Sequence, residues 1–98
     1  AETNEEKLLT LNGVFKEIGY AVDVSSVKGL VNINEKNEVV IDSGNKTSVP
    51  GIFAAGDATT VPFKQTVISA GEGAKAALEC YKFITGAKTV GIDWEKKK

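Results

Sequence analysis

The chain has 98 residues, with 12 Lys and Arg against 13 Asp and Glu, and a formal net charge of -1. This length suits one small domain, and the balanced charge gives no reason to expect a nucleic acid or an anionic membrane as partner. The absence of histidine excludes Ser-His-Asp and Cys-His catalytic sites and histidine metal sites. A single cysteine, Cys80, excludes an internal disulfide and a CxxC redox pair. One unpaired cysteine is compatible with a reducing compartment, and we expect a cytoplasmic location.

The first half of the chain predicts short strands separated by turns. Residues 14–18 form a strand candidate between two glycines, and residues 24–28 fit one helical turn. The β-branched runs 30–33 and 38–42 flank the polar loop 34–37. Two such runs around a short polar loop predict a β-hairpin.

Residues 51–55, Gly-Ile-Phe-Ala-Ala, differ from the preceding strand candidates because none of them is polar. A run without alternation is typical of a strand that is buried on both faces, as in the parallel part of an α/β sheet. The run ends abruptly at Gly56-Asp57. Asp57 is therefore predicted to stand at the carboxyl end of a strand.

Residues 65–85 predict the one long helix, because apolar residues recur there at spacings of three and four. The stripe consists of Val67, Ala70, Ala74, Ala77, Tyr81 and Ile84. Gly71 and Gly73 lie inside the helix, where each costs about 1 kcal/mol relative to Ala, so we expect a close neighbour on that face. Gly86 is predicted to cap the carboxyl end.

The order of strand, Gly56-Asp57, loop and helix indicates a ligand site. Gly56 has no side chain, so we expect it to let a ligand approach the backbone. Ligands of open α/β sheets bind beyond the carboxyl ends of the strands, and a helix start presents free N–H groups to an anion. A flavin fits both features, because its ribityl hydroxyls donate hydrogen bonds and its N1–C2=O edge carries charge when the ring is reduced. The residues alone leave two alternatives open: Asp57 as a turn or cap carboxylate, and Lys64-Gln65 as a solvated helix start.

Four segments carry a resemblance to a known family. They are Val49-Pro-Gly-Ile-Phe-Ala-Ala-Gly-Asp57, Thr59-Thr-Val-Pro-Phe-Lys-Gln65, Ser69-Ala-Gly-Glu-Gly-Ala-Lys-Ala-Ala77 and Gly13-Val-Phe-Lys-Glu-Ile-Gly19. The chain closely resembles, over roughly residues 10–86, the C-terminal segment of low-molecular-weight thioredoxin reductases. The flavoprotein subunit of alkyl hydroperoxide reductase shares this segment.

The resemblance implies FAD as cofactor and assigns roles to individual residues. The aspartate of the Gly56-Asp57 pair would bind the ribityl chain, and Lys64, Gln65 and Thr66 would approach the N1–O2 edge of the isoalloxazine ring. Phe63-Lys64 is a mild variant of the usual pattern. Residues 20–23, Tyr-Ala-Val-Asp, depart further, because the family often has Pro-Asn in this loop.

The resemblance also implies a fold class. We expect an α/β fold, a partial FAD/NAD(P)-binding Rossmann-like domain with a β-hairpin or meander and one long C-terminal helix. Residues 1–98 would form a single domain, the C-terminal half of an FAD-binding domain. Its parts would be the exit from the nicotinamide domain (1–19), the hairpin region (20–50), the flavin-edge strand and helix (51–86), and a tail (87–98).

The family's GxGxxG motif, second glycine-rich loop and CxxC pair are not in this sequence. We therefore expect a fragment of an NAD(P)H-dependent, FAD-containing thioredoxin-disulfide reductase type of enzyme, not catalytic by itself. Its expected partners are the N-terminal FAD/NAD(P) portion of the parent, a thioredoxin-like or peroxiredoxin-type disulfide acceptor, and a second copy in a homodimer. The alternatives are a split flavin-binding module and a non-catalytic structural domain. Tight FAD binding by this chain would favour the split module, and flavin binding at any concentration would count against the structural domain. The fragment predicts exposed apolar surface.

Overall fold

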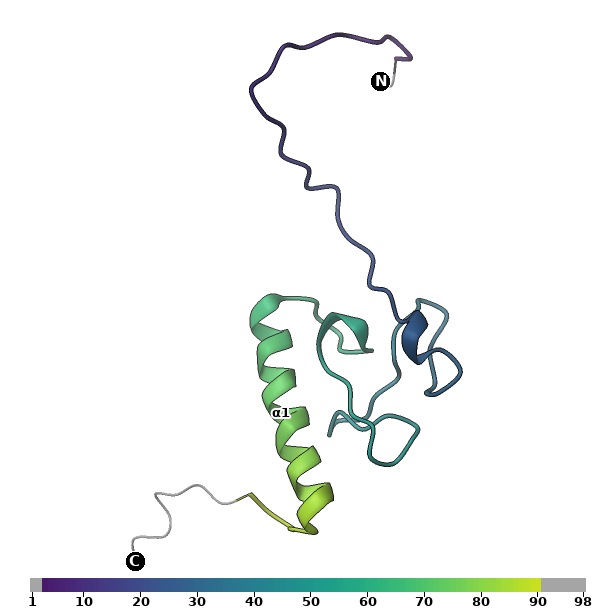
Figure 1. Cartoon of the computed structure of the whole chain (residues 1–98), viewed down its shortest axis with the longest axis vertical. Coiled ribbons are helices and arrows are strands. Elements are labelled where there is room, and N and C mark those ends of the chain that lie inside the picture. The colour runs from purple at the N-terminus through teal and green to yellow at the C-terminus, as the bar shows by residue number, and fades with distance from the viewer. Residues whose placement is uncertain (1–2, 91–98) are drawn as a thin grey trace, which may run out of the picture.

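The computed structural model describes residues 3–90. Its helical elements are the short 3-10 turns η1 (Ser25–Val27) and η2 (Gly56–Ala58), followed by the helix α1 (Thr66–Thr85). Loops packed against one side of α1 form the folded part, and the chain before η1 extends away from it (Figure 1). None of the helices within residues 3–90 combines the length and the apolar character needed to cross a membrane.

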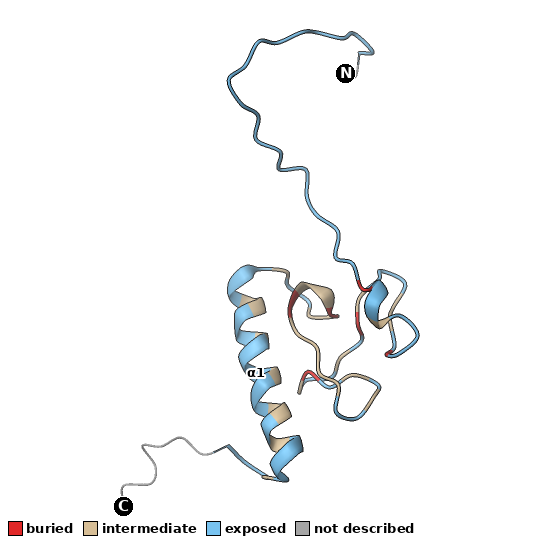
Figure 2. Cartoon of the chain, viewed as in Figure 1, coloured by how far each residue is buried: buried red, intermediate tan, exposed pale blue. Residues whose placement is uncertain are grey.

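The segment 3–22 is extended, and every one of its residues is exposed (Figure 2). The prediction of a strand at residues 14–18 is wrong for the described structure, in which Phe15 is 99% exposed and no bridge involves this segment. The reason is that a strand needs a neighbour for its backbone hydrogen bonds. None of the described residues provides that neighbour.

A small apolar core lies under η1. Val24, Val31 and Val39 are its buried members. Partly buried apolar side chains surround them: Val27, Ile33, Ile41, Val49, Ile52, Ala54 and Ala58. The helical turn expected at residues 24–28 is confirmed by η1, whose residue Val27 packs against this core.

A turn forms where the hairpin was predicted, but it does not open into named strands. Ile33 and Val39 make an isolated antiparallel bridge, and the Asn34 amide donates to the Glu38 carbonyl at 2.9 Å. Asn37 has φ 60°, the left-handed conformation that Asn tolerates in tight turns. The full hairpin or meander therefore stays a prediction.

Residues 51–55 do not form the predicted strand buried on both faces. Phe53 makes an isolated antiparallel bridge with Lys46, and Val39 makes a parallel one with Thr59. The run is exposed at its first residue and only partly buried over the other four. A strand becomes buried on both faces only when neighbouring strands and covering layers surround it, and the described residues supply neither.

The helix prediction is confirmed almost to the residue. Gln65 is the cap of α1, with extended backbone, and α1 begins at the next residue. Gly86 closes the other end at φ 69°, and its amide donates to the Lys82 carbonyl at 2.9 Å. Positive φ is the conformation for which a C-terminal glycine is favoured.

The apolar stripe of α1 faces away from the rest of the folded part. Val67 is 83% exposed and Ile84 is 76% exposed. The partly buried positions of the helix are Ile68, Ser69, Glu72, Ala76, Glu79, Cys80 and Lys82. Figure 2 shows the exposed face as a continuous pale blue side of α1. The expectation of exposed apolar surface is confirmed, whereas the close neighbour expected at Gly71 and Gly73 is not found among the described residues.

Candidate functional site

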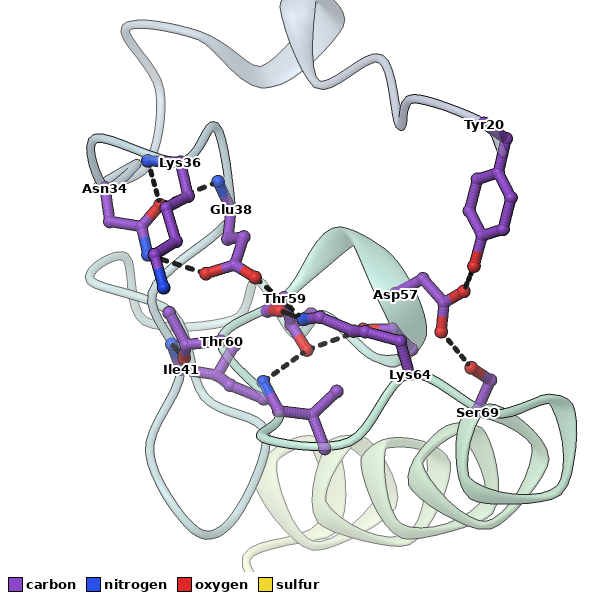
Figure 3. Close-up of polar contacts among 12 residues, drawn as sticks. Tyr20, Asn34, Lys36, Glu38, Ile41, Asp57, Thr59, Thr60, Lys64 and Ser69 are labelled. Atoms are coloured by element: carbon purple, nitrogen blue, oxygen red, sulfur yellow. Dashed lines mark hydrogen bonds and ion pairs between the residues drawn. The ribbon is translucent and has the colours of Figure 1, made fainter. Parts of the chain in front are cut away.

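Asp57 lies in η2, immediately after the apolar run, and is partly buried. Its two carboxylate oxygens accept hydrogen bonds from opposite directions (Figure 3). The Ser69 hydroxyl, on the first turn of α1, donates to Oδ1 at 2.8 Å. The Tyr20 hydroxyl, on the extended segment, donates to Oδ2. The carboxylate therefore joins three parts of the chain that are distant in sequence.

Hydrogen bonds favour the ionised form of Asp57. Those from Tyr20 and Ser69, with the positive charge of Lys64, hold the pKa of this carboxyl below its usual range. The same bond to Asp57 raises the pKa of the Tyr20 phenol. At neutral pH the pair is thus an ionised acceptor and a neutral hydroxyl donor.

Gly56 is buried and has φ 79°. A Cβ at this position would lie 3.2 Å from Ser69 Oγ. We expected a glycine here to let a ligand approach the backbone; in the described structure it lets η2 approach α1. Both the left-handed backbone and the close contact favour glycine, and together they bring Asp57 beside Ser69.

Lys64 is engaged within the chain and does not extend freely into solvent. Its Nζ lies 3.0 Å from Glu38 Oε1 and also donates to the Thr59 carbonyl. Hydrogen bonds from Asn34 and Lys64 hold the pKa of Glu38 below its usual range. The ion pair therefore connects the turn at residues 34–38 with the loop that leads into α1.

Thr59 is the fully buried residue of that loop. Its hydroxyl donates to the Gly56 carbonyl at 2.7 Å and accepts from the Val61 amide at 3.3 Å. The neighbouring Thr60 hydroxyl accepts from the Ile41 amide at 3.2 Å. These bonds fix the path from η2 to the helix. The sequence places both threonines in a segment that resembles the family but predicts no structural role for either.

The start of α1 is open. Gln65 and Thr66 are exposed, the Gln65 side chain makes no capping bond, and the first turn contains no acidic residue. The positive end of the helix dipole is consequently not neutralised by a carboxylate on the helix itself. Lys64, Gln65 and Thr66 are contiguous, but only Lys64 reaches the cavity described next.

A cavity of about 360 Å³ brings together two of the five predicted residues, Asp57 and Lys64. Its remaining lining residues are Tyr20, Ala21, Val22, Lys36, Asn37 and Glu38. Gly56, Gln65 and Thr66 lie outside the lining. A second cavity, of about 370 Å³, lies beside Phe53 and Phe83 and contains none of the predicted site residues.

Three residues of this site were missed from sequence. From sequence, Tyr20 is only a departure from the loop pattern, while Glu38 belongs to a predicted strand and Ser69 to the predicted helix. Each acts through a contact distant in sequence: Tyr20 with Asp57, Glu38 with Lys64, and Ser69 with Asp57. No local spacing reports such contacts.

A further polar link attaches α1 to the loops. Asn45 is fully buried, and its Nδ2 donates to the Ala54 carbonyl at 3.0 Å and to Glu72 Oε2 at 2.7 Å. Glu72 also pairs with Lys75, at 2.8 Å, and its bond to Asn45 places it on the inward face of α1.

Comparison with known proteins identifies the family. The model of the pyridine nucleotide-disulphide oxidoreductase family matches residues 1–95. An alkyl hydroperoxide reductase subunit of Staphylococcus aureus (strain Mu50 / ATCC 700699) is 51% identical over 82 residues, which are 84% of this chain and 16% of that protein. The corresponding Pseudomonas putida protein is 46% identical over 79 residues, 81% of this chain and 15% of that protein.

The solved structures agree. A thioredoxin reductase from Gloeobacter violaceus superposes with a TM-score of 0.62 and 37% identity, over 68% of this chain and 23% of that chain. The chain thus spans about a sixth of the length of the curated relatives, 16% and 15% of the two quoted above. The matched model, the relatives and the fold show that the chain belongs to the pyridine nucleotide-disulphide oxidoreductase family.

Proposed function

We propose that this chain supplies the ribityl and ring-edge contacts for FAD in a thioredoxin reductase-like oxidoreductase, and that it is not catalytic by itself. The observation that carries the proposal is Asp57, an ionised carboxylate held at a Gly-Asp turn beside a cavity and next to the start of α1. Family membership makes a flavin and a pyridine nucleotide the expected cofactors.

The chemistry of Asp57 fits a polyhydroxyl chain. An ionised carboxylate only accepts hydrogen bonds, and both of its present donors are hydroxyl groups, those of Tyr20 and Ser69. Ribityl hydroxyls are donors of the same kind. The cavity of about 360 Å³ is sized for part of a dinucleotide, so the rest of FAD would need walls from elsewhere.

The start of α1 fits an edge that gains negative charge. Its first turn carries no acidic side chain, and the cap side chain makes no hydrogen bond to the backbone amides. A favourable helix end contributes about 0.3–1 kcal/mol to a nearby negative charge. FAD would supply the redox chemistry, while Lys64, Gln65 and Thr66 would bind and orient the ring edge.

The remaining parts of the activity belong to the proposed parent enzyme. An N-terminal FAD/NAD(P) portion would be the obligatory partner, and residues 1–19 would lead in from its nicotinamide domain. NAD(P)H as electron donor, a thioredoxin-like or peroxiredoxin-type disulfide as acceptor, a homodimer and a cytoplasmic location complete the proposal. The exposed stripe of α1 supports a partner surface.

A split flavin-binding module is the second candidate. The same exposed stripe suits a chain that completes a flavin site together with another chain. Tight FAD binding by the isolated chain favours this module. Binding that needs millimolar FAD favours the fragment, because the pyrophosphate half of the site would be missing.

Flavin fluorescence during an FAD titration tests the proposal. Asp57→Asn removes the charged acceptor while keeping the shape of the side chain, and we expect it to weaken binding by about tenfold or more. Glu17→Gln is the matched control, because it removes one charge from an exposed residue outside the cavity. Equal affinities of the wild-type chain and Asp57→Asn would contradict the assignment.

A further inference from the structure

Tyr20 makes the one hydrogen bond that ties the segment 3–22 to the rest of the described chain. Its side chain is 74% exposed, although its hydroxyl reaches Asp57 (Figure 3). Gly19, at φ 93°, turns the backbone just before it. Apart from this contact, the segment is exposed along its whole length.

The two donors to Asp57 are not equivalent. Ser69 is partly buried and belongs to α1, so its bond to Oδ1 is part of the folded structure. Tyr20 is exposed and lies on a segment without other hydrogen bonds to the described residues, so its bond to Oδ2 can open without disturbing the core. An incoming hydroxyl can replace the phenol at Oδ2 at little structural cost.

The same segment closes one side of the cavity. Tyr20, Ala21 and Val22 line it from the extended segment, and Lys36, Glu38 and Lys64 line it from the folded part. Moving Tyr20 therefore frees a carboxylate oxygen and opens this wall at the same time.

We propose that Tyr20 is a displaceable latch: its hydroxyl holds the Asp57 oxygen that a ligand hydroxyl would take, and ligand binding releases residues 3–22. This inference rests on the proposed function of Asp57. The ligand class is a polyhydroxyl chain, such as the ribityl group of a flavin. Because only the open state binds, the apparent dissociation constant equals the intrinsic one divided by the fraction of molecules that are unlatched.

Titration of the whole chain with riboflavin and lumiflavin tests the latch. Riboflavin carries the ribityl chain, and lumiflavin has the same ring system with a methyl group in its place. We expect Tyr20→Phe to bind riboflavin about three- to tenfold more tightly than the wild-type chain, since one hydrogen bond no longer competes. Lumiflavin affinity stays the same. Tyr81→Phe, which removes the hydroxyl of an exposed tyrosine on α1, changes neither affinity.

Limited trypsin cleavage gives an independent measurement. Lys16 lies on the segment that the latch holds and is exposed. We expect riboflavin to accelerate cleavage after Lys16 in the wild-type chain. In Tyr20→Phe the segment is already released, so cleavage is fast with or without riboflavin.

The outcomes separate the latch from the proposed function. Equal riboflavin affinity of the wild-type chain and Tyr20→Phe, with binding still lost in Asp57→Asn, overturns the latch and leaves the role of Asp57 intact. Weaker binding by Tyr20→Phe also overturns the latch, because Tyr20 would then contact the ligand directly. Riboflavin binding that is absent, or indifferent to Asp57→Asn, overturns both.

Discussion

The hydroxyls of Tyr20 and Ser69 stabilise the carboxylate form of Asp57, and Asp57 is the central residue of the candidate site. The position of Asp57 after an apolar run and before a helix could be predicted from sequence, because that order is local. Its partners could not, since Tyr20 and Ser69 reach it from segments distant along the chain. Gly56 was predicted as part of the site, but the contact that requires a glycine is with Ser69.

The Tyr20–Asp57 contact has a defined pH window. The pKa of Asp57 is lowered in the folded chain, so the stabilisation by its charged form is present above the usual carboxyl range and is lost as pH falls through the lowered pKa. The pKa of Tyr20 is raised, so its contribution is complete below the usual tyrosine range and is lost as pH rises through the raised pKa. The contact is therefore expected between these limits.

Carboxyl ¹³C NMR titration measures this coupling. In Tyr20→Phe we expect the pKa of Asp57 to rise toward its usual range, because the largest cause of its lowering is the Tyr20 hydrogen bond. Tyr81→Phe serves as the control. An Asp57 titration curve that is identical in the wild-type chain and Tyr20→Phe would show that the hydrogen bond does not form in solution.

At the scale of elements, the sequence predicted those features that depend on residues close together along the chain. The spacing of apolar residues by three and four predicted the helix, and Gly86 predicted where it ends. The strands at 14–18 and 51–55 were not found, because a strand depends on a neighbour that no local pattern identifies. The same limit applies to α1: its period predicts an apolar face, but not that its polar face would pack inward.

The approach of η2 to α1 can be tested with two glycines. Gly56 and Gly29 both have positive φ, but only at Gly56 would a Cβ meet a close neighbour, Ser69 Oγ at 3.2 Å. We expect Gly29→Ala to cost about 1 kcal/mol of unfolding free energy from backbone strain, and Gly56→Ala to cost about 1 kcal/mol more from overpacking. Urea unfolding measures both. Equal losses would mean that the η2–α1 contact contributes nothing.

The polar link between α1 and the loops can be tested in the same way. Asn45 and Asn37 share φ 60°, but only Asn45 is buried. Asn45→Ala also removes the donor to Glu72 and to the Ala54 carbonyl, and we expect it to lose about 1–3 kcal/mol more than Asn37→Ala in urea unfolding. A loss no larger than that of Asn37→Ala would exclude a stabilising role for these bonds.

At the scale of the whole molecule, a small core supports a large exposed apolar surface. Three valines are the buried hydrophobic residues of the described chain, while α1 exposes its stripe. The exposed apolar surface fits a chain that spans 16% of a relative's length, because a surface that packs inside a larger protein is apolar. The motif around Asp57 predicted the family from sequence, but not which contacts the described residues make by themselves.

The most direct test of the account is the FAD titration of the whole chain beside Asp57→Asn and Glu17→Gln. The account predicts that the wild-type chain and Glu17→Gln quench or shift flavin fluorescence at the same FAD concentration, and that Asp57→Asn requires at least about tenfold more. The same affinity in all three proteins would contradict the assignment of Asp57 as the ribityl-binding carboxylate.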